Sequence, residues 1–356
     1  MKKVAIVGTN GLPAKYGGFE TLTNYLTINL RDNYKFIVYC SKNNDLNRSK
    51  EFNGAKLIHL PLNANGFQSI FYDIFSMLHA IFFADTLLVL GTPGAVIFPF
   101  IKIFNKKIVV NFGGLEWKRE KWPIIARKYL KLTEKIAVNF ADVVVADNQA
   151  FINYINKEYG VDATLIEYGG DHVLRQGFGD NLFEKYPFVK DKYLLSVSRA
   201  QIDNNIHLLL EAFDKSNSLT KLVIISNWGS SEYGISLKDK YSTIKNIILL
   251  NAVYDQLELD FIRNNAYLYI HTHSFCGTAP SLVEAMNHEL SIVCFDVDTN
   301  RYTTENQCKY FKDVDELVAI LENNENNLEN IKTKMYAIAE KRYRWEIISN
   351  KYSELF

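Results

Sequence analysis

The chain has 356 residues, of which 48% are hydrophobic and 13% aromatic, so it is long and apolar enough to bury two cores. Its 40 basic residues balance 40 acidic ones, and such a neutral chain lacks the basic footprint that bulk binding of nucleic acid requires. We therefore expect no nucleic acid among its partners. The four cysteines form no C-x-x-C pair and show no metal-site spacing, which favours reduced thiols in a cytoplasmic protein.

Short runs rich in β-branched residues alternate with helical patterns along the chain. The first half has strand candidates at residues 3–7, 36–39, 56–60, 86–90, 107–111, 142–146 and 164–167. The second half has them at residues 193–198, 222–226, 247–250, 266–270 and 291–295. Most are continuous apolar runs, which are typical of strands buried on both faces of a mostly parallel sheet. Two successive arrays of this kind predict an α/β protein with two Rossmann-like, doubly wound domains.

The two arrays are separated by residues 169–192, which are rich in glycine and polar residues and show no strong periodicity. We expect an N-terminal domain over residues 1–175 and a C-terminal domain over residues 176–335. The remaining residues, 336–356, end in large apolar side chains at helical spacing. Because an amphipathic helix must bury its apolar face, this terminal helix is expected to pack back on the N-terminal domain.

The loop after the first predicted strand carries Tyr16, Gly17 and Gly18 just before a predicted helix. Two adjacent glycines let the backbone approach a bulky ligand, and a helix start favours a phosphate. The G-x-G-x-x-G spacing of dinucleotide-binding loops is absent. The alternative is a flexible loop whose glycines serve only turn geometry, but a first-strand loop is where ligands bind in such sheets.

A second candidate loop follows the strand at 107–111. It holds Gly113, Gly114, Glu116, Trp117 and Lys118. An indole face suits a sugar ring, and carboxylate and ammonium groups bond its hydroxyls. The alternative is the start of a surface helix in which the tryptophan is a packing anchor.

Residues 66–83 have apolar side chains at helical spacing and a single formal charge, at Asp73. A buried core helix is the simpler interpretation. The other is that exposed aromatic side chains contact a membrane or a lipid-linked acceptor. No stretch predicts a transmembrane helix, because glycine and proline interrupt the nearest candidate, at 87–103.

Arg199 directly follows the first strand of the second array, and an arginine binds a diphosphate through two hydrogen bonds. The alternative is an ion pair with a surface acid such as Asp203. Loops after the next two strands, around Trp228 and Tyr254, are positioned to flank a base.

The strand at 266–270 runs into a loop of small residues and then an apolar helix with Glu284 in its first turn. Unpaired N–H groups and the helix dipole would make an anion site, and the carboxylate would suit ribose hydroxyls. His271 and His273 lack a third ligand at metal-site spacing, which favours structural or substrate-contacting histidines.

Four stretches together resemble the retaining glycosyltransferases of family 4, which have the GT-B fold of two domains facing a central cleft. They resemble more closely the bacterial rhamnosyltransferases of capsule and cell-wall polysaccharide synthesis. The matching stretches are GLPAKYGGFET at 11–21, GLEWKR at 114–119, Asn204-Asn205-Ile206 after Arg199, and HSFCGTAPSLVEAM at 273–286.

The resemblance implies a nucleotide-sugar donor in the C-terminal domain, an acceptor in the N-terminal domain, and no metal ion or other cofactor. The implied catalytic residues are Arg199 and Glu116. The implied nucleotide ligands are Gly17, Gly18, Arg199, Asn204, Tyr254, Thr278, Ala279, Ser281 and Glu284, the second glutamate of the E-x7-E motif. The implied donor-sugar contacts are Gly113, Gly114, Glu116, Cys276 and Gly277. The implied acceptor contacts are Tyr16, Trp117 and Lys118.

Three departures from the family pattern concern the sugar. Cys276 replaces the first glutamate of E-x7-E, Asn204 replaces a lysine, and Gly113 replaces a histidine that contacts the 6-hydroxyl of a hexose. A 6-deoxy sugar fits these changes, so dTDP-L-rhamnose is the expected donor. The alternatives are a UDP- or GDP-hexose donor, another GT-B enzyme such as a nucleotide-sugar epimerase, and a catalytically silent nucleotide-sugar-binding partner.

The sequence shows no pair of carboxylates that would predict a covalent mechanism. The family instead implies that the departing phosphate oxygen deprotonates the acceptor hydroxyl, while the enzyme positions both substrates and stabilises the diphosphate. The expected acceptor is a lipid-linked saccharide, and the expected location is the cytoplasm, with peripheral contact at the inner face of the membrane.

Overall fold

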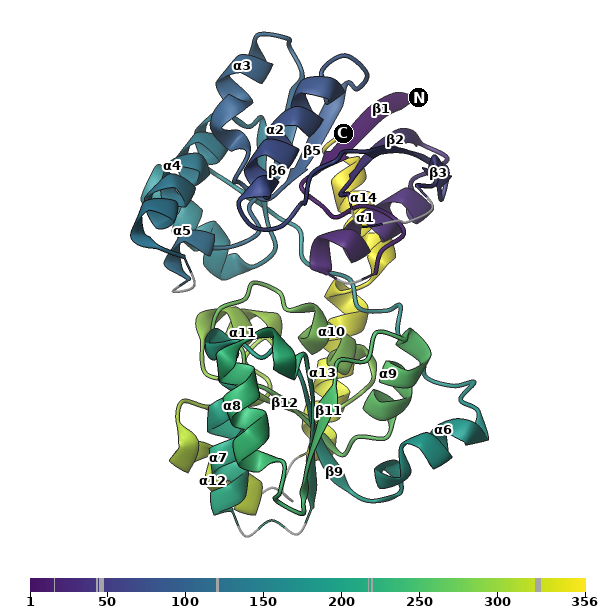
Figure 1. Ribbon diagram of the computed structural model, residues 1–356, viewed down its shortest axis with the longest axis vertical. Coiled ribbons are helices and arrows are strands. Elements are labelled where there is room, and N and C mark those ends of the chain that lie inside the picture. The colour runs from purple at the N-terminus through teal and green to yellow at the C-terminus, as the bar shows by residue number, and fades with distance from the viewer. Residues whose placement is uncertain are drawn as a thin grey trace. The chain divides into compact units, whose positions relative to one another are not determined.

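The computed structural model describes residues 1–15, 17–42, 44, 48–119, 122–216, 218, 220–323 and 328–356. The chain forms two compact units, each an α/β array with its own largely parallel sheet (Figure 1). The first unit contains Met1–Tyr168 and Trp345–Phe356, and the second contains Gly169–Arg344. The predicted boundary at residue 175 therefore lies inside the second unit. The predicted α/β class with two parallel arrays is confirmed.

The sheet of the first unit has the strand order β3-β4-β2-β1-β5-β6-β7-β8. All its neighbouring pairs are parallel except β3 with β4. Its strands are β1 (Lys2–Val7), β2 (Tyr34–Cys40), β3 (Glu51–Phe52), β4 (Ala55–His59), β5 (Thr86–Leu90), β6 (Lys107–Asn111), β7 (Val143–Ala146) and β8 (Thr164–Leu165). The central strands β1 and β5 are buried along most of their length, as their continuous apolar sequences predict.

The helices of the first unit cover its sheet and include the end of the chain. They are α1 (Gly18–Asn29), α2 (Gln68–Ala80), η1 (Ala95–Ile97), α3 (Phe98–Lys102), η2 (Glu116–Lys118), α4 (Ile124–Phe140), α5 (Gln149–Tyr159) and α14 (Trp345–Ser353). Figure 1 shows α14 beside α1, where Trp345 stacks on Tyr25 at 4.5 Å between ring centroids. The Asn111 amide also donates to the Tyr352 hydroxyl, at 2.7 Å. The last helix thus packs within the first unit.

The sheet of the second unit has the order β11-β10-β9-β12-β13-β14, and all its pairs are parallel. Its strands are β9 (Tyr193–Val197), β10 (Lys221–Ser226), β11 (Ile247–Asn251), β12 (Leu268–His271), β13 (Ile292–Phe295) and β14 (Lys309–Phe311). Its helices are α6 (Asp180–Lys185), η3 (Pro187–Lys190), η4 (Ile202–Asn204), α7 (Ile206–Lys215), η5 (Trp228–Ser230), α8 (Glu232–Tyr241), α9 (Gln256–Asn264), α10 (Pro280–Asn287), α11 (Asp298–Thr303), α12 (Val314–Glu322) and α13 (Leu328–Arg342). The predicted terminal segment 336–356 therefore includes the end of α13, which stays in this unit.

Helix α2 is buried on one side and exposed on the other, and aromatic residues lie on both sides. Tyr72, Asp73 and Met77 face the core, whereas Phe71 and Phe75 are exposed. Asp73 packs so closely on Gly94 that a methyl group at Gly94 would clash with it. The interpretation of this segment as a core helix therefore holds for Tyr72 and Met77 but not for Phe71 and Phe75. No helix in the described part of the chain is long and apolar enough to cross a membrane.

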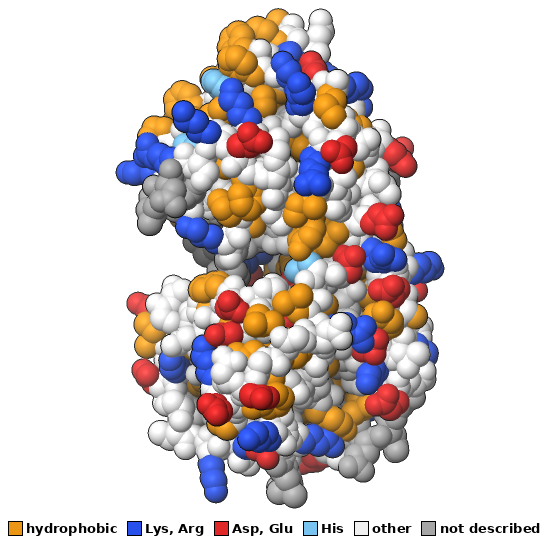
Figure 2. All heavy atoms as spheres, turned by 90° about the vertical axis from the view of Figure 1, so that its right-hand side faces the viewer, with side chains coloured by type: hydrophobic (Ala, Val, Ile, Leu, Met, Phe, Trp, Pro, Cys, Tyr) orange, Lys and Arg blue, Asp and Glu red, His pale blue; other side chains and the backbone are white. Residues whose placement is uncertain are grey.

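Charged side chains of both signs are interspersed on the face of the molecule drawn in Figure 2. This mixing agrees with the equal numbers of acidic and basic residues in the sequence.

Candidate functional site

The candidate site of the second unit lies where β9 and β12, which are neighbours in the sheet, reach their carboxyl ends. Hydrogen bonds tie the loops after these two strands together. The Ser274 N–H donates to the Asp203 carbonyl at 3.0 Å, and the Asn205 amide donates to the Thr272 carbonyl at 3.1 Å. Ligands of open α/β sheets bind at this edge. The fold therefore brings the two sequence motifs of this domain together.

Arg199 is exposed on the first of these loops. Among the described residues it forms no ion pair, so the alternative pairing with Asp203 does not occur. Asn204 is buried, and its amide donates to the carbonyl of Arg199 at 2.8 Å. Asn204 thus shapes the loop that presents the arginine, while the guanidinium stays available for an anion.

Helix α10 begins with Ala279 as its cap and Pro280 in its first turn. Within the described ranges, the N–H groups of Ala279 and Ser281 have no backbone acceptor, as expected at a helix start. Gly277 and Thr278 precede the cap and are buried, whereas Cys276 is partly exposed and forms no disulfide. This helix start can offer backbone donors to a phosphate.

Glu284 is the fifth residue of α10, one turn later than predicted, and its side chain is 14% exposed. The Arg263 guanidinium of α9 donates to one carboxylate oxygen, and His172 Nε2 lies 3.3 Å from the other. Burial raises the pKa of the Glu284 carboxyl, but the Arg263 charge and the His172 hydrogen bond outweigh it, so the pKa is lowered. Glu284 is therefore held as an oriented carboxylate.

The network continues from Arg263 to Asp260, whose carboxylate is fully buried. Asp260 also accepts from His288 Nε2 at 2.9 Å and from the Leu174 N–H at 2.8 Å. Burial acts to raise the pKa of Asp260, but the His288 hydrogen bond and the Arg263 charge lower it. Sequence reasoning did not identify Arg263 and His172, because charged residues in an amphipathic helix and in a glycine-rich connection both resemble surface positions.

The two histidines at the end of β12 lie together, with 4.3 Å between their ring centroids. Burial and the neighbouring His273 hold the pKa of His271 well below its ordinary value, so His271 is neutral. Nowhere in the described part of the chain do three or more His, Cys, Asp or Glu side chains gather so that they could hold a metal ion.

The two loops predicted to flank a base differ. Trp228 is buried and its indole N–H donates to the Leu250 carbonyl at 2.7 Å, so it serves packing. Tyr254 is exposed after β11, the edge strand of the sheet. Only Tyr254 therefore offers an accessible ring, which could stack on a base.

In the first unit, Glu20 organises the loop that contains the double glycine. Its carboxylate accepts from the Asn10 backbone N–H at 2.7 Å and the Asn10 amide at 2.9 Å. A Cβ at Gly17 would clash with this carboxylate, and φ at Gly17 is 124°. Turn geometry thus explains Gly17 without a ligand. Gly18 opens α1, and Tyr16 lies outside the described residues.

The loop after β6 is occupied by its own contacts. Glu116 lies 2.9 Å from the Arg119 guanidinium and accepts from the Trp122 indole at 3.3 Å. The amines of Lys118 and Lys131 lie 5.4 and 4.7 Å from the Trp117 ring centroid. Trp117 thus already contacts two cations of its own unit, and its role toward an acceptor stays a prediction.

The glycines of this loop have positive φ angles. They are 70° at Gly113 and 117° at Gly114. A Cβ at Gly113 would lie 3.0 Å from the Phe19 ring, so the loop passes close to α1. The loops that carry the predicted donor-sugar and nucleotide-binding glycines of the first unit are thus neighbours.

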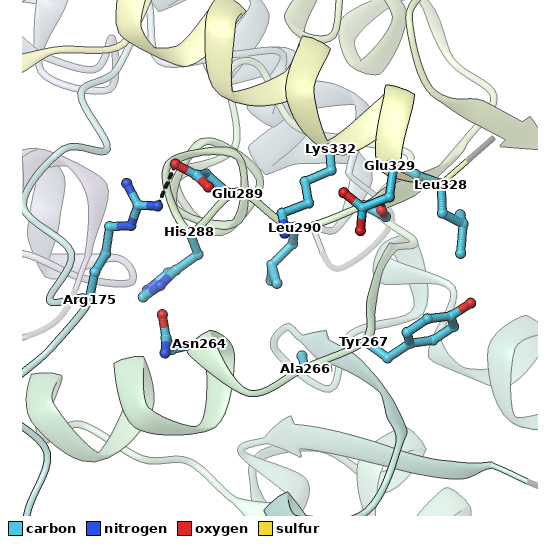
Figure 3. A pocket seen from close by; sticks show the side chains of 11 residues that line it. Arg175, Asn264, Ala266, Tyr267, His288, Glu289, Leu290, Leu328, Glu329 and Lys332 are labelled. Atoms are coloured by element: carbon cyan, nitrogen blue, oxygen red, sulfur yellow. Dashed lines mark hydrogen bonds and ion pairs between the residues drawn. The ribbon is translucent and has the colours of Figure 1, made fainter.

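A cavity of about 300 Å³ lies elsewhere in the second unit (Figure 3). Its lining includes Tyr267 and Ser291, which immediately precede β12 and β13, so it opens at the amino edge of the sheet. Arg175 reaches across to Glu289 and forms an ion pair with it, as Figure 3 shows. This cavity is at the opposite edge from Arg199 and is not the predicted donor site.

Comparisons with known families divide the chain as the fold does. Residues 179–339 match the family described as glycosyl transferases group 1, and residues 1–171 match a domain of unknown function, DUF1972. No curated protein sequence matches the chain. The second unit therefore matches a glycosyltransferase family over most of its length.

Solved structures with the same architecture match the chain over its whole length. A sucrose-phosphate synthase from Thermosynechococcus elongatus has a TM-score of 0.82 at 15% identity and covers 100% of this chain and 98% of its own. Anabaena HepE in complex with UDP-glucose has a TM-score of 0.77 at 16% identity, with 99% of each chain covered. At these identities the similarity shows the fold alone, which is GT-B. The fold and the group 1 domain together support a glycosyltransferase.

Proposed function

We propose that the protein transfers a sugar from a nucleotide-sugar donor to an acceptor hydroxyl. The observation that carries this proposal is the edge of the second sheet, where an unpaired arginine, a helix start and an oriented carboxylate occur on linked loops. Arg199 and the N–H groups before α10 would neutralise the diphosphate, and Glu284 would accept hydrogen bonds from ribose hydroxyls.

The donor that we propose is dTDP-L-rhamnose. By the resemblance to family 4 glycosyltransferases, Cys276 would replace an acid that bonds a hexose hydroxyl, and Gly113 has no side chain that could bond a 6-hydroxyl. A 6-deoxy sugar needs neither contact. The competing donor is a UDP-hexose, which is favoured by the solved neighbour HepE in complex with UDP-glucose.

Transfer with retention would proceed without a protein nucleophile. The departing diphosphate oxygen would take the proton of the acceptor hydroxyl while the new glycosidic bond forms on the same face of the sugar. Stabilising the developing diphosphate charge is then the main catalytic task, and Arg199 would perform it. Because Glu116 is engaged by Arg119, its catalytic role would require that this pair open.

The acceptor that we propose is a lipid-linked saccharide, which would hold the reaction at the inner face of the cell membrane. The protein would meet it there as a peripheral protein. The exposed aromatic residues of α2 in the first unit support this proposal.

Thermal unfolding with dTDP, UDP and GDP tests the nucleotide, since a ligand of the folded state raises the apparent midpoint by mass action. We expect dTDP to raise it most, and Arg199→Ala to reduce the shift. Lys245→Ala is the matched control, because Lys245 is exposed just before β11 at the opposite edge of the sheet. Stabilisation by UDP alone would refute the rhamnose donor.

A further inference from the structure

One solvent-exposed side of the first unit carries an aromatic surface whose side chains are not packed into the core. It comprises Phe67, Phe71, Phe75, Phe82, Ile103 and Phe104. The most open of these side chains are Phe67, Phe82 and Ile103, with exposed fractions of 75%, 72% and 73%. Large apolar side chains gathered in this way on a folded protein mark an interaction site.

The members of this surface are neighbours. Phe67, Phe71 and Phe75 recur every four residues and so lie along one side of α2. The rings of Phe67 and Phe71 are 5.6 Å apart, and the rings of Phe82 and Phe104 are 6.5 Å apart. The second contact joins the end of α2 to the end of α3.

Helix α2 cannot rotate to bury these rings. On its opposite side the Tyr72 hydroxyl donates to the Thr9 carbonyl at 2.9 Å, and Met77 is fully buried in the core. Asp73 is fixed against Gly94. The exposure of Phe71 and Phe75 is therefore built into the register of the helix.

The exposed charges carried by helices α2, α3 and α4 themselves have one sign. The nearest acids outside these helices are Asp142, which pairs with Lys102 of α3, and the exposed Asp85. The only acid of α2 is Asp73 and the only acid of α4 is Glu134, and both are buried, while α3 has none. Lys128 and Lys135 are exposed on α4, which packs against α3. These three helices thus combine exposed apolar rings with exposed cations and present no exposed carboxylate.

We propose that the first unit docks on an anionic lipid bilayer through this aromatic surface, with Lys128 and Lys135 facing the headgroups. Aromatic rings partition into the interfacial region of a bilayer, and lysines near an anionic surface add electrostatic attraction. The proposal refines the membrane location in the proposed function but does not depend on the sugar transferred.

Flotation with vesicles tests the proposal. The wild-type chain should bind vesicles made of an equal mixture of phosphatidylglycerol and phosphatidylcholine. It should bind only weakly to vesicles of phosphatidylcholine alone. Phe75→Glu/Phe82→Glu should lower the partition coefficient at least tenfold, and Lys128→Glu/Lys135→Glu should remove the preference for the anionic lipid. Ile235→Glu is the matched control, because Ile235 is 48% exposed on α8 of the second unit.

Binding by the Phe75→Glu/Phe82→Glu variant equal to that of the wild type would overturn the proposal, as would failure of the wild type to bind. A wild-type dimer that this variant converts to a monomer, without vesicle binding, would instead assign the surface to a second copy of the chain. Phe71→Ser/Phe75→Ser is a second, uncharged variant, and equal thermal midpoints would show that both variants fold. If vesicle binding follows these expectations while no sugar is transferred, the docking surface stands and the proposed function fails.

Discussion

Replacing Arg263 with methionine should destabilise the second unit more than any surface change. Arg263 is buried between Asp260 and Glu284, whose side chains are 0% and 14% exposed. The substitution keeps an unbranched chain but leaves two buried carboxylates without their cation. Breaking a buried ion pair from one side costs about 3–5 kcal/mol, so we expect a loss of that size in the free energy of unfolding at neutral pH.

Urea unfolding of the wild type and of Arg263→Met measures this loss, and Arg301→Met is the matched control. Arg301 donates to Asp296 at 2.9 Å but is 38% exposed, so its loss should cost less than about 1 kcal/mol. Losses of equal size for the two variants would refute the reasoning.

The pH dependence of the Arg263→Met effect has a definite sign. In the wild type the pKa values of Glu284 and Asp260 are lowered, so their stabilising contribution is present above the ordinary carboxyl pKa and is lost as the pH falls through the lowered values. Without Arg263, burial should raise both pKa values. The difference in the free energy of unfolding between variant and wild type should therefore shrink as the pH falls from about 7 to about 5.

Three further predictions concern the candidate donor site of the second unit and the double-glycine loop of the first. Arg199→Ala should lower kcat about 100-fold, equivalent to ~3 kcal/mol of lost charge stabilisation, while Lys245→Ala should leave it unchanged in the same transfer assay. Glu284→Gln should raise KM for the donor. Because the pKa of Glu284 is lowered, the wild type should keep its affinity for dTDP until the pH falls below the ordinary glutamate pKa, as measured by calorimetric titration. Gly17→Ala should lower the thermal midpoint more than Gly66→Ala, because both glycines have positive φ but only the first would meet a neighbouring atom; equal losses would show that the clash is relieved.

Most strands of both sheets could be predicted, because the central ones are continuous apolar runs buried on both faces. The short edge strands β3 and β14 could not. They have only two and three residues and include Glu51 and Lys309, so they carry neither the length nor the pattern of a buried strand.

The site was predictable where its residues belong to local motifs. Arg199 directly follows a strand, and Glu284 lies in the helix after a loop of small residues. Arg263 and His172 were missed because only the fold brings α9 and the segment after Gly170 to α10. Hydrophobic periodicity likewise predicted the width of the apolar face of α2. Which side of α2 is buried depends on the packing of Asp73 against Gly94, which the periodicity does not show.

Mass spectrometry of the reaction with dTDP-L-rhamnose and a lipid-linked saccharide tests the central claim most directly. The proposed function predicts that dTDP is released, that the acceptor gains one deoxyhexose, and that Arg199→Ala slows both steps together. Turnover of UDP-glucose but not of dTDP-L-rhamnose would contradict the proposed donor. Binding of dTDP without turnover of any nucleotide sugar would contradict the enzyme itself.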